Sequence, residues 1–163
     1  MVRLTLLFFL ALLILSVPEG SAGEKGNLTK LREVRIVVED SNSHMREMGL
    51  TEDVLKKQVL ALLLGKLPRV AVNDSAKPFV YVNVNVLYGT MGNRRKYYFG
   101  NVNVQVKQPV IKKNTSKEIS ASVWSISHVV TGPPTSAPDH VRSSLETILT
   151  SLAADWYQDN PIK

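Results

Sequence analysis

The most regular pattern in the chain is an alternation of valine with polar residues in its central third. Within 79–88 valine occupies positions 80, 82, 84 and 86, and within 97–107 it occupies positions 102, 104 and 106. Successive side chains of a strand point to opposite faces, so each run predicts a strand with one apolar face. Gly89, Gly92 and Asn93 lie between the runs and tolerate the positive φ angles of a turn. The two strands are therefore predicted to form an antiparallel hairpin.

The same pattern predicts the register of this hairpin. A turn centred near Asn93 places Asn85 opposite Asn101 and Asn83 opposite Asn103. Both sets of valines then share one face, which a sheet with one buried side requires.

Amphipathic periodicity predicts two helices. Thr51 is a suitable N-cap for a helix that runs to about Leu64, with two acidic residues in its first turn. A second helix follows Ser136, which with Asp139 resembles a capping pair, and Asn160-Pro161 ends it. The residues predicted to be buried are Leu55, Val59, Leu62 and Leu63 in the first helix, and Val141, Leu145, Ile148, Leu149, Leu152 and Trp156 in the second.

Shorter patterns complete the outline. The residue pattern predicts strands at 31–39, 69–72 and 118–130, a loop at 40–49 and a basic loop at 108–118. The last strand has apolar residues on both faces. A turn centred near Lys113 would place Trp124, Ile126 and His128 on the valine face, with Trp124 near Gly100.

These elements predict an α+β fold: a mixed, mainly antiparallel sheet of four to five strands, with two helices packed on one face. Residues 31–163 are expected to form this single domain. The opposite sheet face would be polar and nearly uncharged, since it carries Tyr81, Asn83, Asn85, Phe99, Asn101, Asn103 and Gln105.

The N-terminal segment predicts export. Arg3 precedes an apolar run from Leu4 to Val17, and small residues follow Pro18. This order is typical of a secretory signal peptide at 1–22, cleaved after Ala22 or Gly23 and followed by a flexible leader at 23–30. A retained anchor is the alternative, although a run of about 14 residues is short of the roughly 20 of a spanning helix.

Charge and cysteine content narrow the surroundings. The chain has no cysteine, whereas small secreted animal domains commonly contain disulfides, so a bacterial periplasmic or secreted protein is favoured. The formal net charge of +6 would suggest a nucleic-acid partner for a cytoplasmic protein, but export argues against this, and we expect no nucleic-acid partner. For an exported protein it favours an acidic protein, an anionic envelope component or peripheral contact with a membrane.

Catalytic and metal-binding patterns are weak. His44, His128 and His140 lie in three separate elements without ligand spacing. Ser127 and His128 would face opposite sides of a strand, and no nucleophile-elbow motif occurs. We therefore expect no catalytic site, cofactor or metal.

Two surfaces are candidates for binding. The basic hairpin end Arg94-Arg95-Lys96, followed by aromatic residues, suits a membrane interface or a polyanion, or is a solvated end that discourages edge aggregation. The polar face, with Tyr81, Asn83, Asn85, Phe99, Asn101 and Asn103, suits a partner protein or sugar.

The layout also carries a resemblance. An exported chain with Gly49-Leu50-Thr51-Glu52 opening a helix, then valine-alternating strands and a closing amphipathic helix, resembles small bacterial envelope α+β proteins. It is similar to the lipopolysaccharide-assembly lipoprotein and to the amino-terminal domain of the Tol-system propeller protein, but it lacks the lipobox cysteine. The resemblance implies a non-enzymatic scaffold or binding module and transfers no functional residue.

The leading hypothesis is a non-catalytic exported protein that binds a partner through its open sheet face or basic loops. One alternative is a small hydrolase of an envelope polymer, with His128 or His140 as base. Another is a carrier of a hydrophobic ligand held between helices and sheet.

Overall fold

The computed structural model describes residues 24–91 and 95–161, without the side chains of Met91 and Arg95. The elements follow in the order β1 (Glu33–Val38), α2 (Ser43–Glu47), α3 (Glu52–Lys66), β2 (Ala71–Val72), β3 (Phe79–Met91), β4 (Arg95–Lys112), β5 (Lys117–Gly132), a 3-10 turn η1 (Pro134–Ser136) and α4 (Ala137–Asp159). The predicted signal peptide and Arg94 lie outside the described residues.

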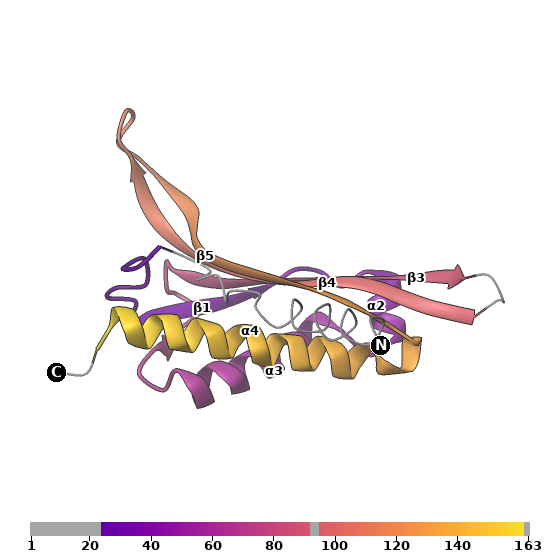
Figure 1. Cartoon of the computed structure of the whole chain (residues 1–163). Helices are drawn as coiled ribbons and strands as arrows, with labels where there is room; N and C mark the ends of the chain where they lie inside the picture. Colours follow the sequence, from indigo (N-terminus) through magenta and orange to yellow (C-terminus); the bar gives the residue numbers. More distant parts are fainter. Residues whose placement is uncertain (1–23, 92–94, 162–163) are drawn as a thin grey trace, which may run out of the picture.

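One sheet of five strands forms the upper layer in Figure 1, with the order β2-β1-β3-β4-β5. β1 pairs in parallel with β2 and with β3, whereas β3, β4 and β5 form an antiparallel meander. The long meander dominates the sheet, so the predicted α+β fold with a mixed, mainly antiparallel sheet is confirmed.

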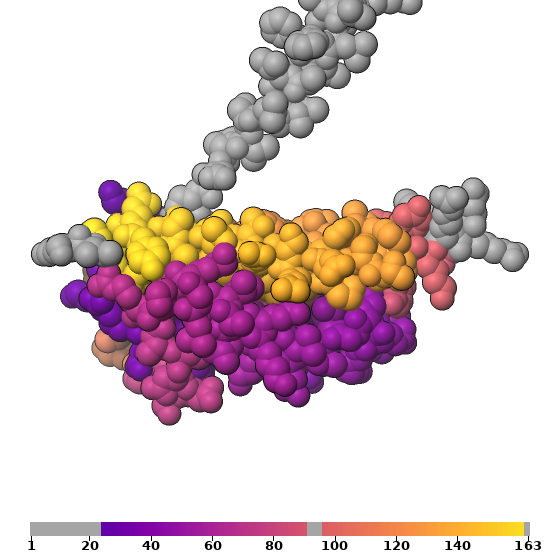
Figure 2. Space-filling model, turned by 90° about the horizontal axis from the view of Figure 1, so that it is seen from below, coloured from indigo at the N-terminus to yellow at the C-terminus, as the bar shows by residue number. Residues whose placement is uncertain are grey.

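The helices cover a single face of this sheet. Figure 2 shows α4 and the α2–α3 segment side by side on that face. Beneath them the valines at 80, 82, 84 and 86 of β3 and at 102, 104 and 106 of β4 are all buried. Burial of these side chains, at about 1.5–3 kcal/mol each, is the main force that holds the two layers together.

Helix α3 begins where its cap predicts. The Thr51 hydroxyl accepts the Val54 N–H at 3.4 Å, and Leu55, Val59 and Leu63 are buried while Leu62 is half-buried.

Helix α4 buries all six residues of the face predicted from its periodicity. The prediction of a Ser136 cap was wrong. Ser136 has helical dihedral angles, and its hydroxyl donates to the Pro133 carbonyl, so it makes no capping bond to the helix. The prolines around it already fix the start of the helix.

The asparagine register is confirmed, because Asn83 lies opposite Asn103 and Asn85 opposite Asn101. Trp124, in contrast, lies opposite Val106 rather than near Gly100. The turn between β4 and β5 lies further along the chain than predicted, and a bulge between Val106 and Lys107 shifts the register again. Trp124 still lies on the valine face, where it is buried.

The predicted basic loop at 108–118 is mostly strand. β4 continues to Lys112 and β5 starts at Lys117, so only 113–116 form a turn. This end of the hairpin projects from the sheet in Figure 1, and we call residues 108–121 the arm. The strands of the arm were hard to predict from the hydrophobic pattern, because neither face of the arm lies against a helix.

The segment expected to be a flexible leader instead folds onto the domain. Leu28 belongs to the hydrophobic core, and the Asp159 carboxylate accepts the N–H groups of Gly26 at 2.7 Å and Leu28 at 2.9 Å. The partners of this turn are at the far end of the chain, so local sequence did not indicate them. The hydrophobic core therefore extends from Leu28 in this segment to Trp156 in α4.

Candidate functional site

The sheet surface opposite the helices, which we call the open face, gathers six of the predicted site residues. Alternation along β3 and β4 places Tyr81, Asn83, Asn85, Phe99, Asn101 and Asn103 on it, each exposed or half-buried. Lys96 is exposed but has the strand parity of buried Tyr98, so it belongs to the side of the helices. The structure therefore separates Lys96 from the other six residues. Arg94 and the side chain of Arg95 lie outside the described part of the chain.

A carboxylate that the sequence analysis did not select also lies on this face. Glu39 follows the end of β1, which runs beside β3. Its side chain accepts the hydroxyl of Tyr81 at 2.6 Å and a hydrogen bond from the Asn83 amide. These two donors stabilise the charged form and hold the pKa of Glu39 below its usual value, while the bond to Glu39 raises the pKa of Tyr81.

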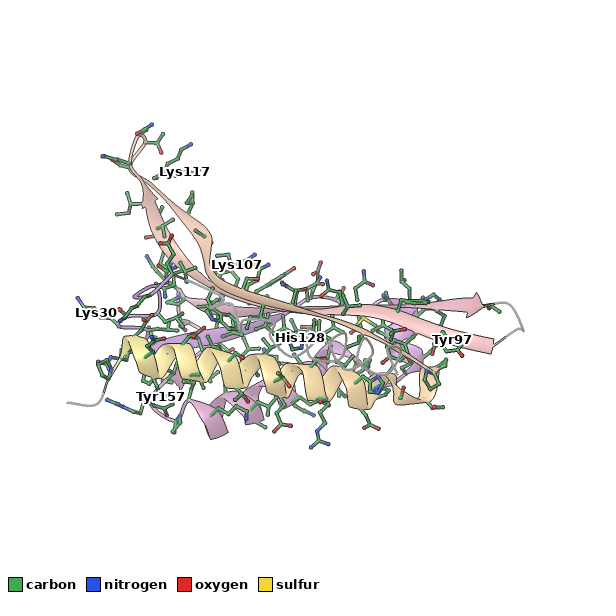
Figure 3. All side chains as sticks on the ribbon, viewed as in Figure 1. Lys30, Tyr97, Lys107, Lys117, His128 and Tyr157 are labelled. Carbon is green, nitrogen blue, oxygen red and sulfur yellow. The ribbon has the colours of Figure 1, made fainter. Side chains whose placement is uncertain are left out.

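Cations lie over the aromatic rings beside this carboxylate. The Lys107 ammonium is 4.3 Å from the ring centroid of Tyr81, and the Arg35 guanidinium is 4.8 Å from that of Phe79. Figure 3 shows Lys107 on the side of the sheet away from the helices. Both distances are within the range of cation–π attraction. At this end of the face, the two cations thus lie over the rings of Phe79 and Tyr81, and the Tyr81 hydroxyl is bonded to Glu39.

Side-chain amides and hydroxyls bond to one another across the middle of the face. Gln105 donates to Asn103 at 2.9 Å, and the Ser127 hydroxyl donates to Asn101 at 2.7 Å. Asn42, just before α2, donates to Asn85 at 2.9 Å. We call this set the amide ladder. Because its members hold one another in place, a partner would meet preoriented groups that retain free donors and acceptors.

The far end of the face is apolar and exposed. Leu87, Phe99 and Val129 have exposed fractions of 54%, 46% and 82%. Leu87 of β3 lies directly opposite Phe99 of β4. Val129 of β5 lies opposite Asn101, which is the next residue after Phe99 on this face of β4. The Phe99 ring also covers Gly89, approaching within 3.5 Å of the position a Cβ would take. We call the three side chains the apolar patch. Sequence reasoning did not select Val129, because β5 has apolar residues on both faces and its phase was left ambiguous.

The two histidines considered as catalytic bases lie in different elements and differ in exposure. His140 is exposed at the start of α4, and its Nδ1 is hydrogen-bonded with the hydroxyl of Tyr98. Burial raises the pKa of that hydroxyl. His128 lies opposite Val102, half-buried on the helix side of β5. The structure thus keeps the two residues on different elements.

Neither a metal cluster nor a membrane-spanning helix emerges from residues 24–91 and 95–161. No group of three or more His, Asp or Glu side chains within that part is placed to hold a metal ion. None of its helices is both long and apolar enough to cross a bilayer. A hollow of about 250 Å³ lies between the N-terminal turn and the end of α4, with Glu24, Asp155 and Asp159 in its lining.

Comparisons with known proteins give similarities of chain layout at low identity. No family model and no curated protein sequence matches the chain. Among solved structures, a PelC dodecamer from Paraburkholderia phytofirmans, a single-substitution variant, is 19% identical, with a TM-score of 0.42, covering 74% of this chain and 86% of that one. A minor lipoprotein from Acinetobacter baumannii is 9% identical, with a TM-score of 0.34, covering 81% and 88%. A putative neuraminyllactose-binding hemagglutinin homolog from Helicobacter pylori is 13% identical, with a TM-score of 0.30, covering 91% and 90%.

Proposed function

We propose that this chain is an exported, non-catalytic protein that binds a partner protein through its open face. The observation that carries the proposal is the apolar patch, three exposed side chains that adjoin the preoriented amide ladder. Interfaces between proteins combine contiguous apolar side chains with neighbouring hydrogen-bonding groups. Apolar residues exposed singly, in contrast, are normal on any protein surface and do not indicate an interface.

Charge favours a protein over an anionic ligand on this surface. Glu39, Lys107 and Arg35 lie toward one end of the face, and no charged side chain belongs to the amide ladder or to the apolar patch. A partner with apolar side chains and backbone hydrogen-bonding groups fits this nearly neutral surface. The apolar N-terminal segment with its small-residue exit supports export, which would make the partner an envelope or extracellular protein.

The test uses a tagged chain of residues 23–163, which contains every element of the folded body. Phe99→Asp and Val129→Asp introduce charge into the apolar patch without touching the core. Leu64→Asp is the matched control, because Leu64 is 52% exposed on α3 in the opposite layer. Recovery of each protein from the solubilised envelope of the source is then quantified by mass spectrometry.

The proposal requires one partner whose recovery falls at least tenfold with both patch variants and stays unchanged with Leu64→Asp. A photo-crosslinking residue at Asn101 should then form a covalent adduct with that same partner. If no protein depends on the patch, or if the crosslink joins only two copies of the chain, binding of a separate partner protein is refuted.

A further inference from the structure

The arm is the part of the sheet that no other layer supports. Helix α4 packs on β5 nearer its C-terminal end, whereas every residue from Ile111 to Ser120 is exposed. Figure 1 shows the arm turning away from the plane of the sheet. It begins just beyond the bulge at Val106/Lys107, and a bulge bends a strand in this way. Five residues of strand extend the arm by about 16 Å beyond the bulge.

The end of the arm concentrates positive charge. Lys112 lies directly opposite Lys117, and Lys113 follows in the turn. Like charges in directly opposed positions of a sheet repel each other. The acid in the arm, Glu118, is bound instead to Lys77 of the body, at 3.1 Å. Figure 3 shows Lys117 near the end of the arm, far from the helices. An anion would relieve the repulsion between the two opposed lysines.

Apolar side chains adjoin these lysines on both faces of the arm. Val110 lies opposite Ile119 on the same face as the lysine pair, and Ile111 lies on the other face. Ile111 is 72% exposed and Ile119 is 42% exposed. A soluble polyanion would use the lysines but gain little from the isoleucines. A membrane surface uses both, because apolar side chains enter the interface while lysine ammonium groups stay among the headgroups.

We propose that the arm binds the surface of a membrane that contains anionic phospholipids. Lys112, Lys113 and Lys117 contact lipid phosphates, and Ile111 and Ile119 insert at the headgroup boundary. The site is distinct from the apolar patch, which lies toward the opposite end of β4. Binding by the arm and binding by the open face can therefore succeed or fail independently.

The test measures sedimentation of residues 23–163 with vesicles of phosphatidylcholine, with or without about a quarter phosphatidylglycerol. Each lysine near an anionic surface is worth about fivefold in binding, so Lys112→Gln with Lys117→Gln should weaken binding about 25-fold. The matched control is Lys56→Gln with Lys57→Gln, which removes the same charge from exposed positions of α3. It should change binding less than threefold.

Two further variants separate a membrane from a soluble anion. Ile111→Asn with Ile119→Asn keeps the charge and should weaken vesicle binding at least fivefold, while Leu64→Asn should not. Because the chain has no cysteine, Ser120→Cys gives a single site for an environment-sensitive fluorophore. Its emission should shift to the blue when anionic vesicles are added, and that of a fluorophore at Ser143→Cys on α4 should not.

Certain results would overturn the proposal. One is equal binding to neutral and anionic vesicles. Another is equal weakening of vesicle binding by the double variants at Lys112/Lys117 and at Lys56/Lys57, which would show that binding depends only on net charge. Full retention of binding by the isoleucine variant, together with tight binding to inorganic polyphosphate, would assign the arm to a soluble anion instead. Circular dichroism of every variant must match that of the parent chain, since the arm contributes nothing to the core.

Discussion

Gly100 offers a direct test of how closely β3 and β4 approach. It lies opposite Val86 and Val130 in the middle of the meander. A Cβ added there would be 2.7 Å from the Asn85 carbonyl oxygen and 2.9 Å from a methyl group of Val86. The first neighbour is backbone, so relief requires the strands themselves to move. Gly100→Ala should therefore destabilise the fold.

The magnitude follows from this geometry. Extra carbon atoms in a packed core typically cost about 1–3 kcal/mol, and the rigid carbonyl favours the upper half of that range. Gly89→Ala is the matched control, because its Cβ would meet only the Phe99 ring at 3.5 Å, an ordinary contact. Replacing a strand glycine there should stabilise the fold by about 0.5–1 kcal/mol. The two variants are thus expected to differ by about 3 kcal/mol.

Urea unfolding gives the measurement. Trp124 and Trp156 are both buried, so their emission reports loss of the core. The slope of unfolding free energy against urea should stay constant while the midpoint falls for Gly100→Ala and rises slightly for Gly89→Ala. A Gly100→Ala protein as stable as the parent would refute the packing argument, and with it the close register of the two strands.

Two further predictions concern polar contacts. Tyr81→Phe removes a hydrogen-bond donor from the Glu39 carboxylate and should raise the pKa of Glu39 toward 4.5. Folding depresses this pKa in the parent chain, so the parent should be more stable than the variant above about pH 5. The difference in stability should close as the pH falls through the folded-state pKa of Glu39. Carboxyl NMR titration measures the Glu39 pKa, and urea midpoints at several pH values measure the stability. An unchanged Glu39 titration would contradict the prediction. Asp159→Ala removes the acceptor of the N-terminal turn, so it should cost about 1–2 kcal/mol and release Leu28 from the core. Trypsin should then cut faster after Lys30, and an unaltered cleavage rate would mean that the turn does not depend on this carboxylate.

Most of the central architecture was predictable from sequence because its determinants are local. Valine alternation with glycine and asparagine between the runs predicted the β3–β4 hairpin and its Asn83–Asn103 register, which the structure confirms. The buried face of α4 was equally predictable from helical spacing. In both cases a short stretch of chain contains the whole pattern, so no distant residue had to be known.

The candidate site was predictable only in part. Alternation placed six residues on the open face, but Glu39 reaches Tyr81 because β1 is the parallel neighbour of β3. Strand order across a crossover is decided by how the helices pack, and no local pattern encodes it. Val129 could not be assigned to a face from the sequence, because apolar residues lie on both sides of β5; its pairing opposite Asn101 places it in the apolar patch.

By itself, then, the sequence determined which faces are apolar, because side-chain periodicity is a property of neighbouring residues. Tertiary structure decided what those faces meet. It buried Leu28 through contacts with Asp159, more than 100 positions away, and left Ile111 and Ile119 exposed on the arm. An isoleucine in a strand has the same local pattern in both situations, and only the presence or absence of a second layer distinguishes a core from a surface available for binding.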